Sequence, residues 1–185
     1  VGYRYGADDN DATVIYRDFD GDNNLLNETV RMTEETETDH NIETSLSYRR
    51  TFEEDSDREC TFDFKYINDD DTELATYEQT SDTTETPLIQ NSSNTEDEIN
   101  WLFQTDYIHP IGENSKVEGG LRAALRQVNN DFLVQEQADD GAFFPLSRFN
   151  DKLTYNENVY AAYFIGATEF GQLGIQLGLR TEYSD

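Results

Sequence analysis

The sequence is poor in the features that usually stabilise a small protein. Its single cysteine, Cys60, excludes an internal disulfide and a cysteine-based metal cluster. No run approaches the roughly 18 apolar residues of a transmembrane helix, although membrane-spanning strands are shorter and alternate, so they remain possible. Hydrophobic residues make up only 35% of the chain, which by itself would indicate a weak core or disorder.

Basic residues are also scarce. Lys and Arg number 13 against 40 Asp and Glu, giving a formal net charge of -27, and most of the excess lies in residues 1–100. Nucleic acid is excluded as a partner because a phosphate backbone would be repelled. The sequence also lacks HExxH, phosphate-loop and dinucleotide motifs, and acids are so frequent that any carboxylate pair would be uninformative. We therefore expect that this protein is not an enzyme.

Aromatic residues are abundant, with eleven Tyr and eleven Phe against only three Pro, which argues against disorder and favours strands. Period-two alternation recurs along the chain. Between Val117 and Arg126 one face carries Val117, Leu121 and Leu125, and the other carries Arg122 and Arg126. This pattern predicts an all-β, antiparallel protein with seven long strands, at about 1–17, 25–52, 59–80, 96–111, 116–137, 153–170 and 172–184.

The connections between these strands are expected to alternate in length. Residues 53–58, 112–115 and 169–172 are tight and polar, whereas 81–95 and 138–152 are predicted to be long loops, and Asp18–Asn24 to be a short turn. The apolar parts of the strands lie beside the tight turns. Alternating short turns and long loops are typical of an outer-membrane barrel, and several strands are long enough to cross a bilayer.

Several segments resemble a known family. Tyr155-Asn156-Glu157-Asn158-Val159-Tyr160-Ala161-Ala162-Tyr163 and Gly178-Leu179-Arg180-Thr181-Glu182-Tyr183 resemble the barrel of TonB-dependent outer-membrane receptors, in their Bacteroidota-type branch. The resemblance covers about residues 42–185, and segments 46–52, 105–110 and 116–122 fit the same pattern.

The resemblance implies a location in the cell outer membrane and energised uptake of a nutrient such as a metal chelate, glycan or peptide. It implies a transmembrane β-barrel of about 22 strands around a plug. We expect residues 1–185 to be wall strands of one barrel domain, without a plug domain, because the chain already begins within a strand-like pattern. Outer-membrane lipid, the TonB system acting through other parts of the protein, and a surface lipoprotein are the implied partners.

Two groups of residues are candidates for contact with a solute. Arg122, Arg126, Arg180 and Glu182 occupy the polar faces of their strands and would point into the lumen, either lining a solute path or pairing with a plug. They could equally form a structural ladder of ion pairs. Phe143, Phe144 and Phe149 lie in the predicted loop 138–152 and either contact a ligand or pack the loop interior.

The segment from Asp18 to Asn24 resembles a calcium loop, because Asp18, Asp20 and Asp22 place carboxylates at alternate positions. An EF-hand requires Gly at the sixth position and Glu at the twelfth, where this chain has Asn23 and Thr29. The EF-hand interpretation therefore fails. The alternative is a hairpin turn whose residues tolerate positive φ, and no other cofactor is expected.

Two other architectures remain open at this stage. One is a secreted acidic β-sandwich or adhesin-like binding module stabilised by calcium, and the other is a small closed barrel of eight strands. A sandwich buries one face of each strand against a second sheet. A barrel wall instead turns its apolar face toward lipid, and the aromatic side chains on it suit the girdles at the bilayer edges. Those aromatic residues are Tyr48, Tyr66, Trp101, Tyr107, Tyr163 and Tyr183.

Overall fold

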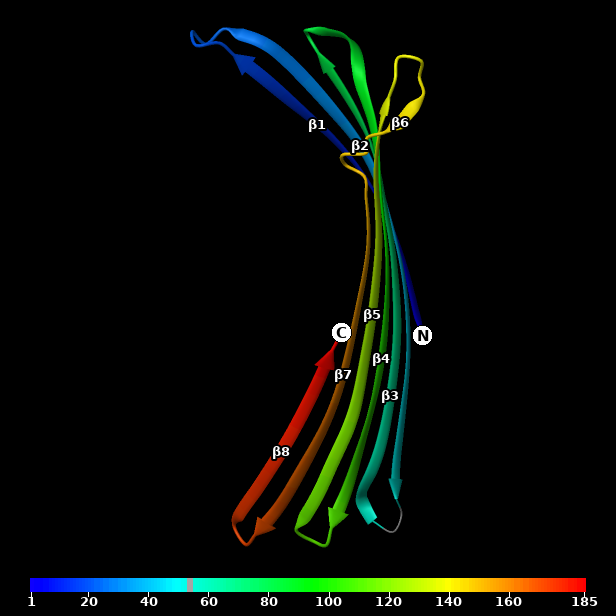
Figure 1. The fold of residues 1–185 in the computed structure, drawn as a ribbon, viewed down its shortest axis with the longest axis vertical. Helices are drawn as coiled ribbons and strands as arrows, with labels where there is room; N and C mark the ends of the chain where they lie inside the picture. The colour runs from blue at the N-terminus through cyan, green and yellow to red at the C-terminus, as the bar shows by residue number, and fades with distance from the viewer. Residues whose placement is uncertain (53–54) are drawn as a thin grey trace.

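The computed structural model describes residues 1–52 and 55–185, and these form an all-β structure (Figure 1). No helix in the described residues is long and apolar enough to cross a membrane. The strands are β1 (Gly2–Phe19), β2 (Leu25–Phe52), β3 (Asp55–Ser81), β4 (Thr84–Ile111), β5 (Ser115–Gln137), β6 (Phe143–Pro145), β7 (Asp151–Phe170) and β8 (Leu173–Ser184).

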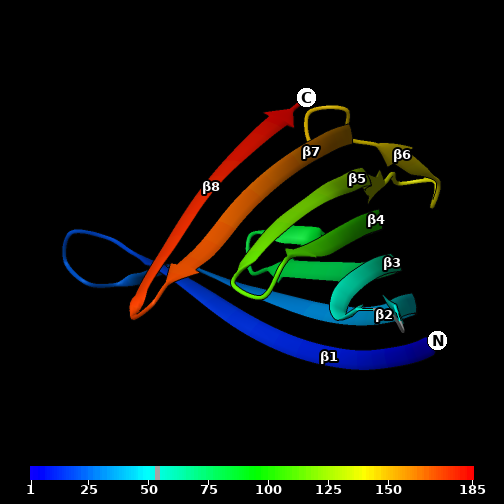
Figure 2. The same cartoon turned by 90° about the horizontal axis from the view of Figure 1, so that it is seen from below.

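The strands form one antiparallel sheet in the order β1-β2-β3-β4-β5-β7-β8, with the short β6 paired to β5. Each long strand lies beside its neighbour in sequence, as in an up-and-down barrel wall. Figure 2 shows a single curved layer. Among the described residues the only buried hydrophobic side chain is Ala75, so the sheet has no core of its own.

The seven predicted strands are confirmed, and their pairing explains why the alternation is so clear. Leu125 lies opposite Trp101, and Trp101 lies opposite Tyr66, so apolar positions align from strand to strand. Arg126 lies opposite Asn100 and Glu157, so polar positions align on the other side. We call the first side the apolar face and the second the polar face.

The prediction of a long loop at 81–95 is wrong. β3 runs to Ser81, β4 begins at Thr84, and Ser81 pairs with Thr84 across a tight turn. The Ser, Thr and Asn residues that indicated a loop instead form a polar ladder with β3, in which Thr76 donates to Asn91 at 3.2 Å. A strand outside both core and lipid has no need of apolar side chains, which removes the signal used to find it.

The predicted alternation of tight turns and long loops is therefore only partly present. Residues 138–150 are the one long connection at the upper end in Figure 1, within the described part of the chain, and the strands themselves extend upward in place of the others. The lower end carries tight turns as well, and Gly112 and Gly171 take positive φ there, as sharp reversals require.

Neither alternative architecture fits the described residues. The sheet is not closed, because β1 and β8 stand at opposite ends of the strand order and do not pair, so the closed eight-stranded barrel is wrong. A sandwich requires a second sheet packed on the first, and residues 1–52 and 55–185 form only one sheet.

Candidate functional site

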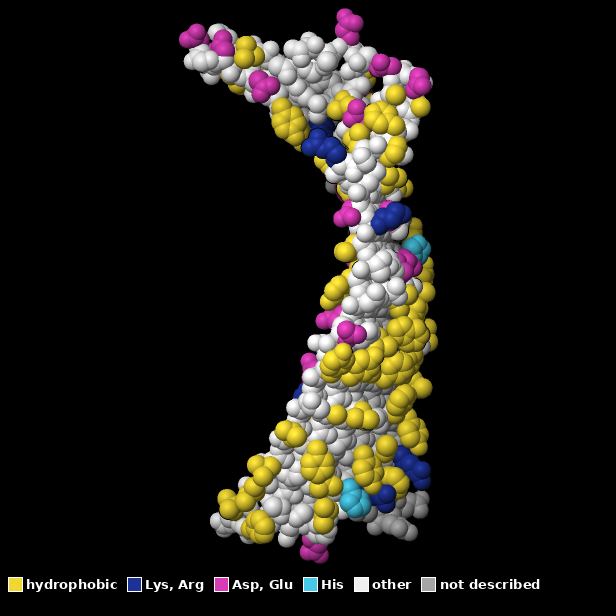
Figure 3. Space-filling model, viewed as in Figure 1, with side chains coloured by type: hydrophobic (Ala, Val, Ile, Leu, Met, Phe, Trp, Pro, Cys, Tyr) yellow, Lys and Arg dark blue, Asp and Glu magenta, His cyan; other side chains and the backbone are white. Residues whose placement is uncertain are grey.

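The first functional feature is a band of apolar side chains on the apolar face. These side chains are exposed, because no other part of the described chain covers them. Leu177 and Leu179 are 76% and 77% exposed, and Leu121 is 61% exposed. Aromatic rings pack along the band across strands, with Tyr66 and Trp101 at a centroid distance of 4.4 Å. Figure 3 shows these side chains gathered over the lower half of the molecule, whereas acidic residues mark the upper end. We call this the apolar band; it contains Ile42, Leu46, Tyr48, Cys60, Phe62, Phe64, Tyr66, Ile99, Trp101, Phe103, Tyr107, Val117, Leu121, Leu125, Tyr160, Phe164, Leu173, Ile175, Leu177 and Leu179.

Charged residues limit the band at its upper edge. His40, Asp70 and Asp97 lie in one row across β2, β3 and β4, directly above the apolar positions on the same face. Partial burial, followed by the negative charge of Asp97, raises the pKa of Asp70 above its ordinary value. Because ionised carboxylates are unfavourable in hydrocarbon, this row sets the upper limit of any lipid contact.

The polar face carries a hydrogen-bonded cluster at the depth of the band. The Tyr163 hydroxyl lies 2.6 Å from Asp106 Oδ1 and 3.0 Å from Glu118 Oε1. Gly120 makes room for this contact, since a Cβ there would lie 2.3 Å from both Asp106 Oδ1 and the Tyr163 ring. The cluster ties β4, β5 and β7 together.

The four predicted lumen residues all lie on the polar face, but the structure does not bring them into one site. Arg126 forms a two-pronged ion pair with Glu98, at 2.9 and 2.7 Å. Arg180 pairs with Glu182 on its own strand at 2.8 Å. Arg122 has no ion pair among the described residues and lies between Gln104 and Ala161 in register.

Arg126 therefore matches the cross-strand ion-pair ladder, whereas Arg180 and Glu182 pair with each other within β8. The ladder continues through Lys65–Glu43 at 2.9 Å and Arg49–Glu59 on β2 and β3. Arg122 differs because its guanidinium group is exposed beside a shallow hollow of about 300 Å³ on the polar face. Among the described residues it forms no ion pair, so its charge and donors are free for a solute.

The three phenylalanines of the upper connection are exposed. Phe143 and Phe144 belong to β6, where they pair with Gln137 and Glu136 of β5, and Phe149 follows in the turn to β7. The loop is closed by backbone hydrogen bonds, such as Ala138 N to Ala142 O at 2.8 Å. The rings therefore do not form a packed loop interior, and they face outward from a fixed short hairpin.

The three aspartates of the β1–β2 turn do not converge. Asp20 accepts hydrogen bonds from the backbone amides of Asp22 and Asn24, at 2.9 and 2.7 Å, and from the Asn24 side chain at 2.9 Å. These bonds, chiefly those from Asn24, lower the pKa of Asp20. Asp18 pairs with Asn27 within the ladder. No group of three or more metal-ligating side chains occurs in the described residues, and the turn is organised by its own donors.

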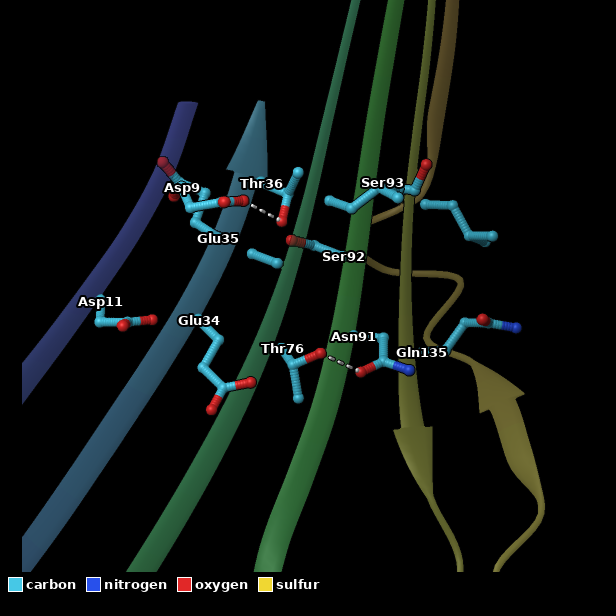
Figure 4. Close-up of a pocket in the computed structure, with 13 residues that line it drawn as sticks. Asp9, Asp11, Glu34, Glu35, Thr36, Thr76, Asn91, Ser92, Ser93 and Gln135 are labelled. Carbon is cyan, nitrogen blue, oxygen red and sulfur yellow. Dashed lines mark hydrogen bonds between the residues drawn. The ribbon is translucent and has the colours of Figure 1, made fainter. Parts of the chain in front are cut away.

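Sequence reasoning missed a polar hollow above the band, of about 550 Å³ (Figure 4). Acids from β1 and β2 line it together with amide and hydroxyl groups from β3 and β4; Thr36 donates to Asp9 at 3.1 Å. The acids around Asp9 are visible in the sequence as a run of charged residues. The opposite wall, which includes Asn91, was hidden because residues 81–95 were expected to be a loop.

Comparison with known proteins gives one family. Residues 50–185, well over half of the chain, match the outer membrane protein beta-barrel family. The chain belongs to this family. A search of curated proteins found no match. Membership places the protein in the outer membrane, where the walls of barrels turn an apolar band toward lipid.

Within this barrel family, the girdle prediction requires one correction. Four of the six predicted girdle residues lie on the apolar face of the paired strands β2, β3 and β4: Tyr48, Tyr66, Trp101 and Tyr107. Tyr163 lies on the polar face, where its hydroxyl meets two carboxylates. β7 is fairly apolar on both faces, so alternation alone could not decide which of its faces meets lipid.

Proposed function

We propose that this chain is a wall segment of a TonB-dependent transporter-like barrel of about 22 strands. Such a barrel would take up a scarce nutrient, such as a metal chelate, a glycan or a peptide, across the outer membrane. The segment would contribute wall strands and surface-exposed extensions and would carry out no catalysis.

The observation that carries the proposal is the sorting of side chains at one depth. Leu121 is exposed on one face, and the adjacent Arg122 is exposed on the other. A water-soluble sheet has no reason to leave so much apolar area uncovered. A wall between lipid and an aqueous lumen requires this sorting.

The sheet edges support a large barrel. β1 and β8 each have one side without a partner strand in the described residues. Unpaired backbone groups are costly in lipid, so a wall of this kind needs further strands on both sides.

The polar face supports solute passage through that barrel. Arg122 offers donors at the depth of the band that no ion pair of the described residues uses, whereas Arg126 is paired with Glu98 of the neighbouring strand and Arg180 with Glu182 of its own. At the upper end, Phe143, Phe144 and Phe149 would contact an arriving ligand or a surface lipoprotein. Coupling to the TonB system would use other parts of the protein.

Uptake measured in living cells tests the proposal. A strain lacking the gene should lose uptake of one class among labelled metal chelates, glycans and peptides, and a strain lacking TonB should lose the same uptake. Complementation with the Arg122→Glu variant should weaken uptake at an unchanged level of protein in the outer membrane, because this variant reverses a charge on the polar face that no ion pair of the described residues neutralises. Uptake that persists without TonB would show that the barrel is a passive pore or a structural protein.

A further inference from the structure

A cluster of arginines and aromatic rings lies just below the apolar band, on the same face. The guanidinium carbons of Arg50 and Arg58 lie 4.8 and 4.3 Å from the centroid of the Phe52 ring. Arg58 also donates from Nε to the Tyr107 hydroxyl at 2.7 Å and lies over the Tyr107 ring at 5.6 Å. Arg50 and Arg58 therefore share the Phe52 ring, and the contact with Tyr107 also holds Arg58 in place.

The charges of this cluster are not balanced by any carboxylate whose side chain the structure describes. Among the side chains that the structure describes, seven basic residues form ion pairs, and Arg50 and Arg58 are among the six that do not. The nearest acid of the ladder, Glu59, points to the polar face and pairs with Arg49. The guanidinium groups of Arg50 and Arg58 contact the same Phe52 ring, and their mutual repulsion favours an anion beside them.

The position of the cluster identifies the source of that anion. On β2 the apolar face ends at Tyr48 and the next residue on it is Arg50; on β3 the band begins at Cys60, just after Arg58. Both arginines thus lie one position beyond the hydrocarbon contact, at the end where the strands turn back close to the band, whereas at the opposite end β2, β3 and β4 extend far beyond it (Figure 1). Short turns of such barrels face the periplasm, so this depth is that of the phosphates of the inner leaflet.

We propose that Arg50, Arg58, Phe52 and Tyr107 form a binding site for the headgroup phosphate of an anionic glycerophospholipid of the inner leaflet. Arg58 keeps its Nη groups for the phosphate while Nε is held by Tyr107, and guanidinium forks match phosphate oxygens well. The acyl chains would lie upward against Cys60 and Phe62 on the band. The site rests on the outer-membrane location and not on the proposed transport.

Native mass spectrometry of the whole protein, purified from outer membranes in detergent, tests the site. Phosphatidylglycerol and phosphatidylcholine with identical acyl chains are titrated separately, and inorganic phosphate is titrated alone as the soluble anion. We expect wild type to bind phosphatidylglycerol about tenfold more tightly than phosphatidylcholine, which corresponds to about 1.4 kcal/mol. The Arg50→Gln/Arg58→Gln variant should bind the two lipids equally.

Two further variants keep the test interpretable. Arg50→Lys/Arg58→Lys retains the charges and should retain a preference for phosphatidylglycerol, which separates lost binding from misfolding. Arg122→Gln removes an exposed cation from the polar face and should leave the preference unchanged. Equal binding of both lipids by wild type, or an undiminished preference in the Gln variant, overturns the site. Inorganic phosphate that abolishes the preference would assign the cluster to a soluble anion and overturn the lipid.

Discussion

Replacing Leu121 with arginine separates a lipid-facing wall from a water-exposed sheet. Leu121 is the middle one of five consecutive apolar-face positions on β5, which run from Val117 to Leu125. Its neighbours in register are Thr105 and Ala162, so a new guanidinium group would meet no carboxylate there. The upper end of the band on this strand, marked by Gln127, is about 20 Å away along the chain.

The two environments predict different costs for this substitution. In water, a surface change at a side chain that is 61% exposed alters stability by no more than about 0.5 kcal/mol. Arginine at the lipid midplane of a barrel costs about 2–4 kcal/mol. The matched control is Gln127→Arg, on the same strand and face but outside the band, for which the expected cost is about zero to 1 kcal/mol in either environment.

The measurement is unfolding of the whole protein in phospholipid vesicles by guanidinium, with heat-modifiable gel migration as a second readout of folding. The Leu121→Arg protein should unfold at clearly lower denaturant and the Gln127→Arg protein close to wild type. If Leu121→Arg costs less than about 0.5 kcal/mol, as for a solvated site, the band does not face lipid and the reasoning is refuted.

Three further predictions concern single residues. Tyr163→Phe leaves two facing carboxylates without their shared donor and should cost about 1–3 kcal/mol in the same vesicle assay; no loss would show that the cluster is not formed. Gly120→Ala should cost about 1–3 kcal/mol because its Cβ meets a carboxylate and a ring, whereas Gly166→Ala, with nothing within 4 Å, should not. The pKa of Asp20 is lowered below its ordinary value of 3.8, so its hydrogen bonds are fully present above that pH and are lost as the pH falls through the lower folded value. The protection factor of the Asn24 amide, which removes the pH dependence of intrinsic exchange, should fall over that range in wild type and be low at all pH values in Asp20→Ala; a wild-type protection factor that does not change with pH would contradict this.

The sequence was sufficient to predict the membrane-depth part of the sheet, for a physical reason. Residues there meet hydrocarbon on one side and water on the other, so the alternation between Leu121 and Arg122 is enforced at each position. Above the band both sides meet water. The residues from Thr84 to Thr95 therefore carry no alternation and resembled a loop, although they form a ladder with β3.

The contacts between strands were harder to predict, because they depend on register. The cluster of Tyr163, Asp106 and Glu118 draws on three strands, and a single sequence does not say which residues lie opposite one another. One signal was available: Gly120 stands inside a strong strand, where glycine often marks a close approach of another group. The cation–π contacts of Arg50 and Arg58 with Phe52 were equally hard to predict. Arg50 and Arg58 lie on different strands, and only the pairing of those strands brings them to the same ring.

The two faces of the sheet together also specify the register between neighbouring strands. A slip of one residue between β4 and β5 would exchange their faces, placing Arg122 and Arg126 in lipid and Leu121 and Leu125 in the lumen. Each face therefore penalises the same error, and the ion pair of Arg126 with Glu98 adds a further constraint at the upper edge. The polar extensions above the band have no such sorting. Their register must be carried upward from the band by the continuous backbone ladder and fixed at the top by tight turns, such as the one that Asp20 organises. A sheet with almost no buried core can hold one structure in this way, because the membrane supplies the discrimination that a core supplies in a soluble protein.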